Sequence, residues 1–178
     1  MRLRLGRLLQ ELAYTFGISA STASRIFNMW INNYLYLRLG MIPIWPEWED
    51  VAASMPHSFR ENYPHTFIII DATELRCQVP SSLALQAKLY SAYKSYTTLK
   101  GLVGIAPNGA FTFISRLYTG SISDRQLVME SGILSLLESV PEHKRVMADR
   151  GFDIQDLLVK HRLILNIPPF NGTKGFLS

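Results

Sequence analysis

Apolar side chains recur at helical spacing in the first part of the chain, with one glycine between two such runs. Leucine, alanine and phenylalanine lie three or four positions apart over 8–16, and Gly17 then suits a left-handed cap that ends the first predicted helix. Ser19 or Ser21 is suited to cap a second predicted helix over 20–37. The two helices and their short turn predict an all-α helix-turn-helix.

Small polar and basic residues occupy one side of the second predicted helix. Ser21, Thr22 and Arg25 lie off much of its apolar stripe. Side chains of this kind suit the groove and the phosphates of DNA, so we predict that these three residues bind DNA. The alternative is a plain helical hairpin that packs against the next domain.

Prolines and tryptophans then replace the helical pattern. Four prolines fall within 40–65, together with Trp45 and Trp48. Prolines at this density break regular elements and predict a linker or wrapping segment, and the tryptophans favour packing on a surface. The predicted domains are a helix-turn-helix (1–39), this linker, and a third segment (66–178).

Beyond residue 65 the pattern changes to β-branched and aromatic runs separated by turns. Strands are predicted over 66–70, 97–105, 110–118, 145–148 and 163–167. Helices are predicted from residue 124, and from residue 153 to about 161. We expect an antiparallel meander first and helical crossovers later, which gives an α/β mixed sheet flanked by helices. Ribonuclease-H-like nucleases have this order of elements, as do many other α/β domains.

Two aspartates directly follow predicted buried strands. Asp71 follows the run that ends at residue 70, and Asp149 follows the run that ends at residue 148. If these strand ends are neighbours, both carboxylates reach one metal ion, as metal-assisted phosphodiester cleavage requires. The alternative is that each aspartate merely caps a turn.

Other acidic residues are less suited to such a site. Glu74 is expected to point away from Asp71, because it lies three positions further along the chain. Asp124 is predicted to be a helix N-cap, which approaches the site only if its helix starts near the strand ends. Asp153 is predicted to cap the following helix.

Lysines alternate with tyrosines before the second predicted strand of the sheet. Lys94 and Lys100 are the predicted DNA-binding members of this stretch, because lysines grip phosphates and tyrosines stack on bases. The alternative is a solvated edge whose tyrosines pack inward.

Composition narrows the class of protein. Hydrophobic residues make up 48% of the 178 residues, enough for a folded core, and the net charge of +4 suits a polyanionic partner. Cys77 is the only cysteine, which predicts an intracellular protein without an intramolecular disulfide or a cysteine-based zinc site. We expect no membrane partner and no small-molecule substrate, because no apolar run spans a bilayer and no phosphate-binding glycine loop or nucleophile elbow occurs.

Six stretches carry specific motifs, in the order LLQELAYTFGISASTASRIF (8–27), FIIIDATE (67–74), YKSYTTLKGLVGIAPNG (93–109), FISRLYTGSISD (113–124), ADRGFDI (148–154) and LNIPPF (165–170). The last five resemble the DDE superfamily endonuclease domain of Harbinger-type transposases. The first resembles the helix-turn-helix that precedes this domain.

The resemblance implies a ribonuclease-H-like fold and action on DNA in the nucleus. It implies that Asp71 is the first catalytic aspartate and that Asp149, in the D-x-G-[FY] motif, is the second. Asp124, in the G-S-x-S-D motif, takes a supporting place in the metal site. The implied cofactor is Mg²⁺ or Mn²⁺.

The family's third acid is a glutamate in an H-V-E-R-like context beyond the stretch 165–170, and no glutamate of this chain lies in the matching place. We therefore expect the central piece of a transposase, cut at both ends, with impaired cleavage. The alternatives are a non-catalytic DNA-binding protein from a decayed transposon and an interaction scaffold that kept only the fold. Homo-oligomer formation stays open.

Overall fold

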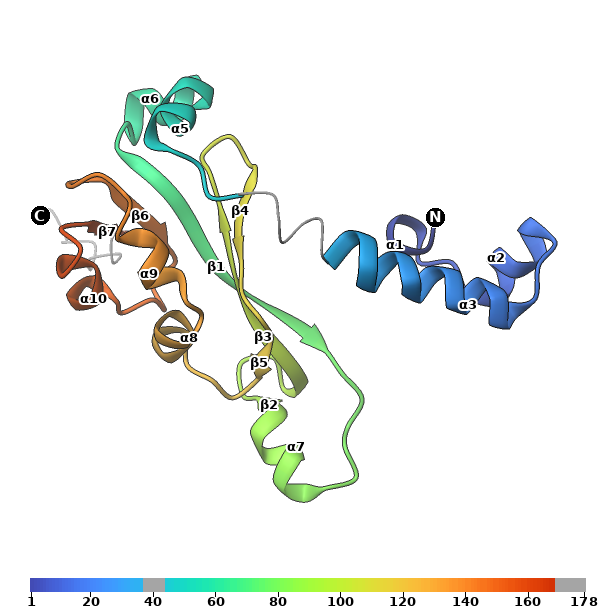
Figure 1. Ribbon diagram of the computed structural model, residues 1–178. Coiled ribbons are helices and arrows are strands. Elements are labelled where there is room, and N and C mark those ends of the chain that lie inside the picture. Colours follow the sequence, from blue (N-terminus) through green and yellow to red (C-terminus); the bar gives the residue numbers. More distant parts are fainter. Residues whose placement is uncertain (37–43, 169–178) are drawn as a thin grey trace, which may run out of the picture. The chain divides into compact units, whose positions relative to one another are not determined.

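The computed structural model describes residues 1–36 and 44–168, and the chain divides into two compact units (Figure 1). The first unit is Met1–Pro43 and the second is Ile44–Ser178. The first unit is helical. The second, called the sheet unit, contains all the strands of the described residues.

Short helices build the first unit. They are α1 (Arg2–Leu5), α2 (Leu9–Phe16), α3 (Ala20–Met29) and the π-helix η1 (Trp30–Tyr36). Gly17 ends α2 with a φ of 63°, and the Ser19 hydroxyl caps α3 by accepting a hydrogen bond from the Thr22 amide at 3.1 Å. α2 packs against α3, in agreement with the predicted helix-turn-helix. The second predicted helix changes to a π-helix after Met29, and its predicted end at residue 37 lies outside the described residues.

A mixed sheet lies at the centre of the sheet unit. Its strands are β1 (Thr66–Arg76), β2 (Tyr90–Ser91), β3 (Tyr96–Ile105), β4 (Phe111–Ile114), β5 (Tyr118–Thr119), β6 (Arg145–Ala148) and β7 (Ile164–Asn166). The order is β2–β3–β1–β6–β7, and β4 and β5 also pair with β3. β1 is antiparallel to β3 and parallel to β6, and β6 is parallel to β7. The mixed α/β sheet, antiparallel first and parallel later, is therefore confirmed.

Six helices accompany this sheet among the described residues. They are α5 (Trp48–Ser54), α6 (His57–Asn62), α7 (Leu83–Leu89), α8 (Asp124–Glu130), α9 (Ile133–Leu137) and α10 (Gln155–Val159). The helix predicted from residue 124 is divided into α8 and α9, because Gly132 takes a φ of 86° between them. The helix predicted to start at Asp153 starts instead after Ile154, without a side-chain cap.

β1 is longer than predicted, and this changes the position of Asp71. The strand continues past Asp71 to Arg76, since the pairing of β1 with β3 extends to the register Arg76–Thr98. Asp71 therefore lies within β1, and the prediction that the strand ends there is wrong. Only the pairing with β6 stops at this point, after Ile70.

The predicted return strand over 110–118 is interrupted. β4 and β5 flank a break at residues 115–117, where the Ser115 hydroxyl accepts a hydrogen bond from the Leu102 amide at 2.8 Å. The Ser115 hydroxyl thus takes the place of a backbone carbonyl as the acceptor for the Leu102 amide. β3 therefore pairs with two short strands in place of one long strand.

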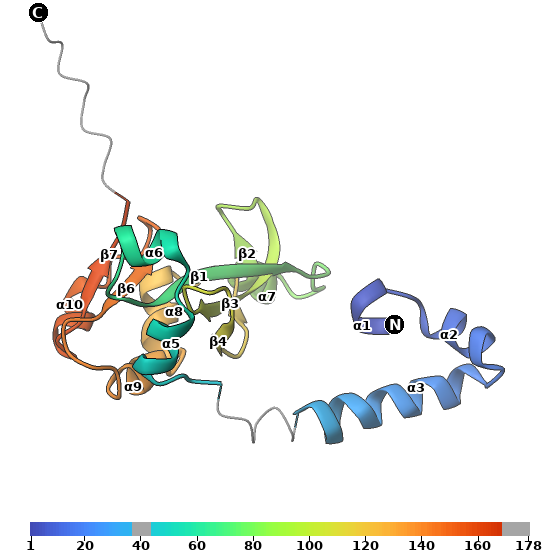
Figure 2. The same cartoon turned by 90° about the horizontal axis from the view of Figure 1, so that it is seen from above.

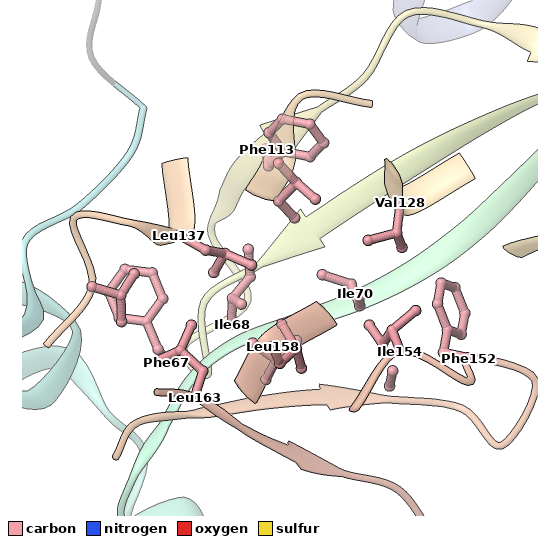
Figure 3. Close-up of a cluster of buried hydrophobic side chains, with 14 of the residues drawn as sticks. Phe67, Ile68, Ile70, Phe113, Val128, Leu137, Phe152, Ile154, Leu158 and Leu163 are labelled. Carbon is pink, nitrogen blue, oxygen red and sulfur yellow. The ribbon is translucent and has the colours of Figure 1, made fainter. Parts of the chain in front are cut away.

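The buried half of β1 runs through the hydrophobic core. Phe67, Ile68 and Ile70 are buried, and Figure 3 shows them beside Leu158 of α10 and Val128 of α8. From Asp71 onward β1 loses this cover. The site residues therefore begin where the core ends.

The described part of the proline- and tryptophan-rich segment packs on the sheet unit. The Trp45 ring centroid lies 5.3 Å from that of Phe67, and Trp45 Nε1 donates a hydrogen bond to the Ser139 hydroxyl at 3.2 Å. Trp48 also packs against the core, and Lys144 Nζ lies 3.8 Å from its ring centroid. Figure 2 shows α5 and α6, the helices of this segment, close to β1.

Candidate active site

Asp71 and Asp149 each directly follow the last paired residues of two neighbouring parallel strands, β1 and β6. β1 and β6 are in register at Ile70 and Ala148, and the next residue of each chain segment is an aspartate. Residues in register on parallel strands direct their side chains to the same face. Both aspartates are exposed and line the same pocket.

Each of these carboxylates is oriented by its own backbone. Asp71 Oδ1 accepts a hydrogen bond from the Ala72 amide at 2.8 Å, and Asp149 Oδ1 accepts one from the Arg150 amide at 2.7 Å. Hydrogen bonds to a carboxylate from a fixed amide restrict its rotation. The two acids are therefore held toward the pocket before any ligand arrives.

The pocket is rich in charged groups and has a volume of about 450 Å³. Four carboxylates and two lysines line it, namely Asp71, Glu74, Asp124, Asp149, Lys94 and Lys100. Glu74 was expected to point away from Asp71. It nevertheless lines the same pocket, and its Oε2 accepts a hydrogen bond from the Thr98 hydroxyl at 2.8 Å.

Asp124 is the first residue of α8 and not its N-cap. The cap is Ser123, whose hydroxyl accepts a hydrogen bond from the Gln126 amide at 3.2 Å. The Asp124 carboxylate instead forms an ion pair with Lys100, with 2.7 Å between Oδ1 and Nζ. The prediction of a capping role is therefore wrong, and the start of α8 brings this acid to the pocket.

Gly151 allows Asp124 to lie close to the turn after Asp149. A methyl group at residue 151 would lie 3.0 Å from Asp124 Oδ2, which is tighter than an ordinary contact. The glycine of the D-R-G motif thus leaves room for a carboxylate from another element. In the sequence this glycine stands out only as part of the D-x-G-[FY] motif.

Tyr93 and Lys94 lie at the rim of the pocket. The Tyr93 side chain is 84% exposed, and Lys94 Nζ lies 4.5 Å from its ring centroid. Both residues line the pocket. The alternative in which the tyrosines pack inward is therefore wrong for Tyr93.

A second ion pair fixes α8 against the segment that follows Asp149. Arg125 donates hydrogen bonds from Nη1 and Nη2 to the two carboxylate oxygens of Asp156, each at 2.6 Å. These hydrogen bonds lower the pKa of Asp156 to about 2. Arg125 Nη1 also donates to the Asp153 carbonyl at 2.6 Å. Because Arg125 follows Asp124, this pair helps to hold Asp124 at the pocket.

The predicted DNA-binding residues of the first unit lie on the first turns of α3. Ser21 and Arg25 are exposed, and Thr22 is half-buried. The Thr22 hydroxyl accepts a hydrogen bond from the Ser19 hydroxyl at 2.8 Å. Thr22 is thus partly used by the cap, whereas Arg25 presents its guanidinium on the surface.

Within residues 1–36 and 44–168, no three histidine, cysteine, aspartate or glutamate side chains are close enough together to hold a metal ion. A metal site built from these residues would rest on fewer protein ligands and on water. Among the helices of the same described ranges, none has the length and apolar character to cross a membrane.

Comparison with known proteins agrees with this geometry. A family model described as DDE superfamily endonuclease matches residues 70–173, which include Asp71, Asp124 and Asp149. A second, described as the helix-turn-helix of DDE superfamily endonuclease, matches residues 1–40. Searches of curated proteins and of solved structures found no match. Endonucleases of this superfamily generally use divalent metal ions. The endonuclease match covers more than half of the chain, and the chain therefore belongs to the DDE superfamily endonucleases.

Proposed function

We propose that this chain is a transposase-derived endonuclease core that cleaves or transfers phosphodiester bonds in DNA. Asp71 and Asp149 would hold the divalent metal ion, Mg²⁺ or Mn²⁺. The observation that carries the proposal is the register of β1 with β6, which brings both carboxylates to one pocket. Within the superfamily we assign the chain to the Harbinger-type transposases, acting in the nucleus.

The donor set fits a hard cation. Both proposed ligands are carboxylates, and both are exposed and held by backbone amides. Mg²⁺ prefers oxygen ligands, uses few protein carboxylates and keeps several of its waters. A divalent ion bound there would activate a water or a DNA 3′ hydroxyl and stabilise the leaving oxygen.

The rim residues would hold the DNA beside these carboxylates. Lys94 carries a positive charge to the edge of an acidic pocket, where it would bind a phosphate. Tyr93 offers an exposed ring on which an unpaired base would stack. DNA is the proposed partner, and homo-oligomer formation stays a prediction.

Nicking of supercoiled DNA in the presence of Mn²⁺ tests the proposal. We expect slow nicking by the wild type, because the described residues assemble no group of three metal ligands. Asp149→Asn is expected to reduce nicking to background, since it removes one metal-binding charge. Asp153→Asn, an exposed aspartate outside the pocket, is the matched control and should keep the wild-type rate. Equal nicking by Asp149→Asn and the wild type would contradict the proposal.

The second candidate function is DNA binding without cleavage, which the exposed Arg25 on α3 favours. Arg25→Ala is expected to cost about 1–3 kcal/mol of binding free energy if the side chain contacts a base, and the loss is measured by electrophoretic mobility shift at low salt. Lys160→Ala removes the same charge from α10's end and should bind like the wild type. DNA binding without any Mn²⁺-dependent nicking would favour this function over the first. No DNA binding by the wild type would exclude it.

A further inference from the structure

Lys100 is a largely buried cation in the acidic pocket. Its side chain is 12% exposed, and its Nζ lies 2.7 Å from Asp124 Oδ1 and donates a hydrogen bond to the Ile122 carbonyl at 3.2 Å. A lysine ammonium has three N–H donors. The hydrogen bond to the Ile122 carbonyl uses one of them, Asp124 is an ion-pair partner without a hydrogen bond to Oδ1, and the ammonium lines the pocket, where it can donate to a ligand.

Asp124 faces Lys100 through one of its oxygens. Oδ1 is buried and lies 2.7 Å from the Lys100 ammonium, its ion-pair partner, and Oδ2 lies on the side of Gly151, where the glycine has no side chain. To bind a metal ion through Oδ1, Asp124 would have to give up an ion pair whose members are only 12% and 28% exposed. Breaking a partly buried pair is costly, because it leaves a charge without a partner. The geometry suits a counter-ion better than a metal ligand.

We propose that Lys100 binds the phosphate group of the DNA at the proposed metal site, and that Asp124 is the positioning residue that holds Lys100 there. Asp124 is then not a third metal ligand. The inference rests on the proposed function. The carboxylates of Asp71 and Asp149 repel a phosphate, and the ammonium of Lys100 beside them offsets this repulsion. Because Asp124 already holds Lys100 in place, little side-chain entropy is lost when the phosphate binds.

The salt dependence of DNA binding tests the part played by Lys100. Binding of a labelled duplex by the full chain is measured in EDTA over a range of salt concentrations. Lys100→Met is expected to weaken binding about tenfold and to reduce the slope of log affinity against log salt by about 0.9, the value for one lost phosphate contact. Lys100→Arg should restore the slope. Lys160→Met, which removes an exposed lysine outside the pocket, should leave it unchanged. Equal slopes for Lys100→Met and Lys160→Met would overturn the proposal.

The sign of the effect of Asp124→Asn tests its positioning role. Removal of a negative charge near DNA by itself strengthens binding. We expect the opposite, a loss of about threefold, because Lys100 would no longer be held in the pocket. In the Lys100→Met background Asp124→Asn should cause no further loss, and this double variant also leaves no unpaired charge that could impair folding. Stronger binding by Asp124→Asn alone would overturn the positioning role.

Calorimetric titration with Mn²⁺ distinguishes this inference from the proposed function. Asp124→Asn should bind Mn²⁺ within about twofold of the wild type. A loss as large as that of Asp71→Asn would make Asp124 a metal ligand and overturn the inference. If the wild type binds no Mn²⁺, the proposed function fails, whereas the measurements in EDTA still decide the roles of Lys100 and Asp124.

Discussion

Asp149→Asn and Asp71→Asn are each expected to lower the affinity for Mn²⁺ at least tenfold, which is about 1.4 kcal/mol of binding free energy. Asparagine keeps the size and shape of the side chain but removes the charge. A divalent cation held by two carboxylates loses half of its protein charge partners with either substitution. Isothermal titration calorimetry near neutral pH measures the affinity, and the double variant should show no binding.

Asp153→Asn is the matched control for these variants. Asp153 is exposed and follows Asp149 by four positions, but its side chain does not line the pocket. The control should bind Mn²⁺ as the wild type does. Equal affinities for Asp71→Asn, Asp149→Asn and Asp153→Asn would show that any Mn²⁺ bound lies elsewhere, and the proposed site would be wrong.

Leu158→Ala is expected to lower the free energy of unfolding by about 2–5 kcal/mol. Leu158 is fully buried, at 0% exposure, and lies in the core beside Ile68 (Figure 3). The smaller side chain loses its transfer free energy and leaves a cavity under β1, the strand that carries Asp71. Urea unfolding of the full chain, followed by tryptophan fluorescence, measures the change; Trp45 and Trp48 pack against the same core.

The neighbouring residue supplies the control for this substitution. Val159 is on the same helix and is 59% exposed, so Val159→Ala should change the free energy of unfolding by less than about 0.5 kcal/mol. The folded fraction of the Leu158→Ala variant should still bind Mn²⁺, because the side chain of residue 158 does not line the pocket. A loss of stability as small as that of Val159→Ala would mean that α10 contributes little to the core.

Local sequence patterns determined much of the fold. The cap at Ser19 and the left-handed Gly17 place the turn between α2 and α3, because these signals act within a few residues. The run before Asp149 predicted a strand over 145–148, and β6 has these same bounds. The motifs around Asp71 and Asp149 singled out the two acids that the structure brings together.

Tertiary contacts decided the rest of the site. β1 runs past Asp71 because β3 continues to pair with it. The residues of β1 alone do not show which strand pairs with them, so the sequence did not predict this extension. Glu74 lies on that extension and lines the pocket. The ion pair of Lys100 with Asp124 joins residues 24 positions apart, across β3 and α8. Helical and strand periodicity report which face of an element is apolar, whereas strand register and the meeting of distant charges depend on how the elements pack. The sequence by itself therefore identified the two aspartates that line the pocket. Only the tertiary structure decided which other charged groups line it with them.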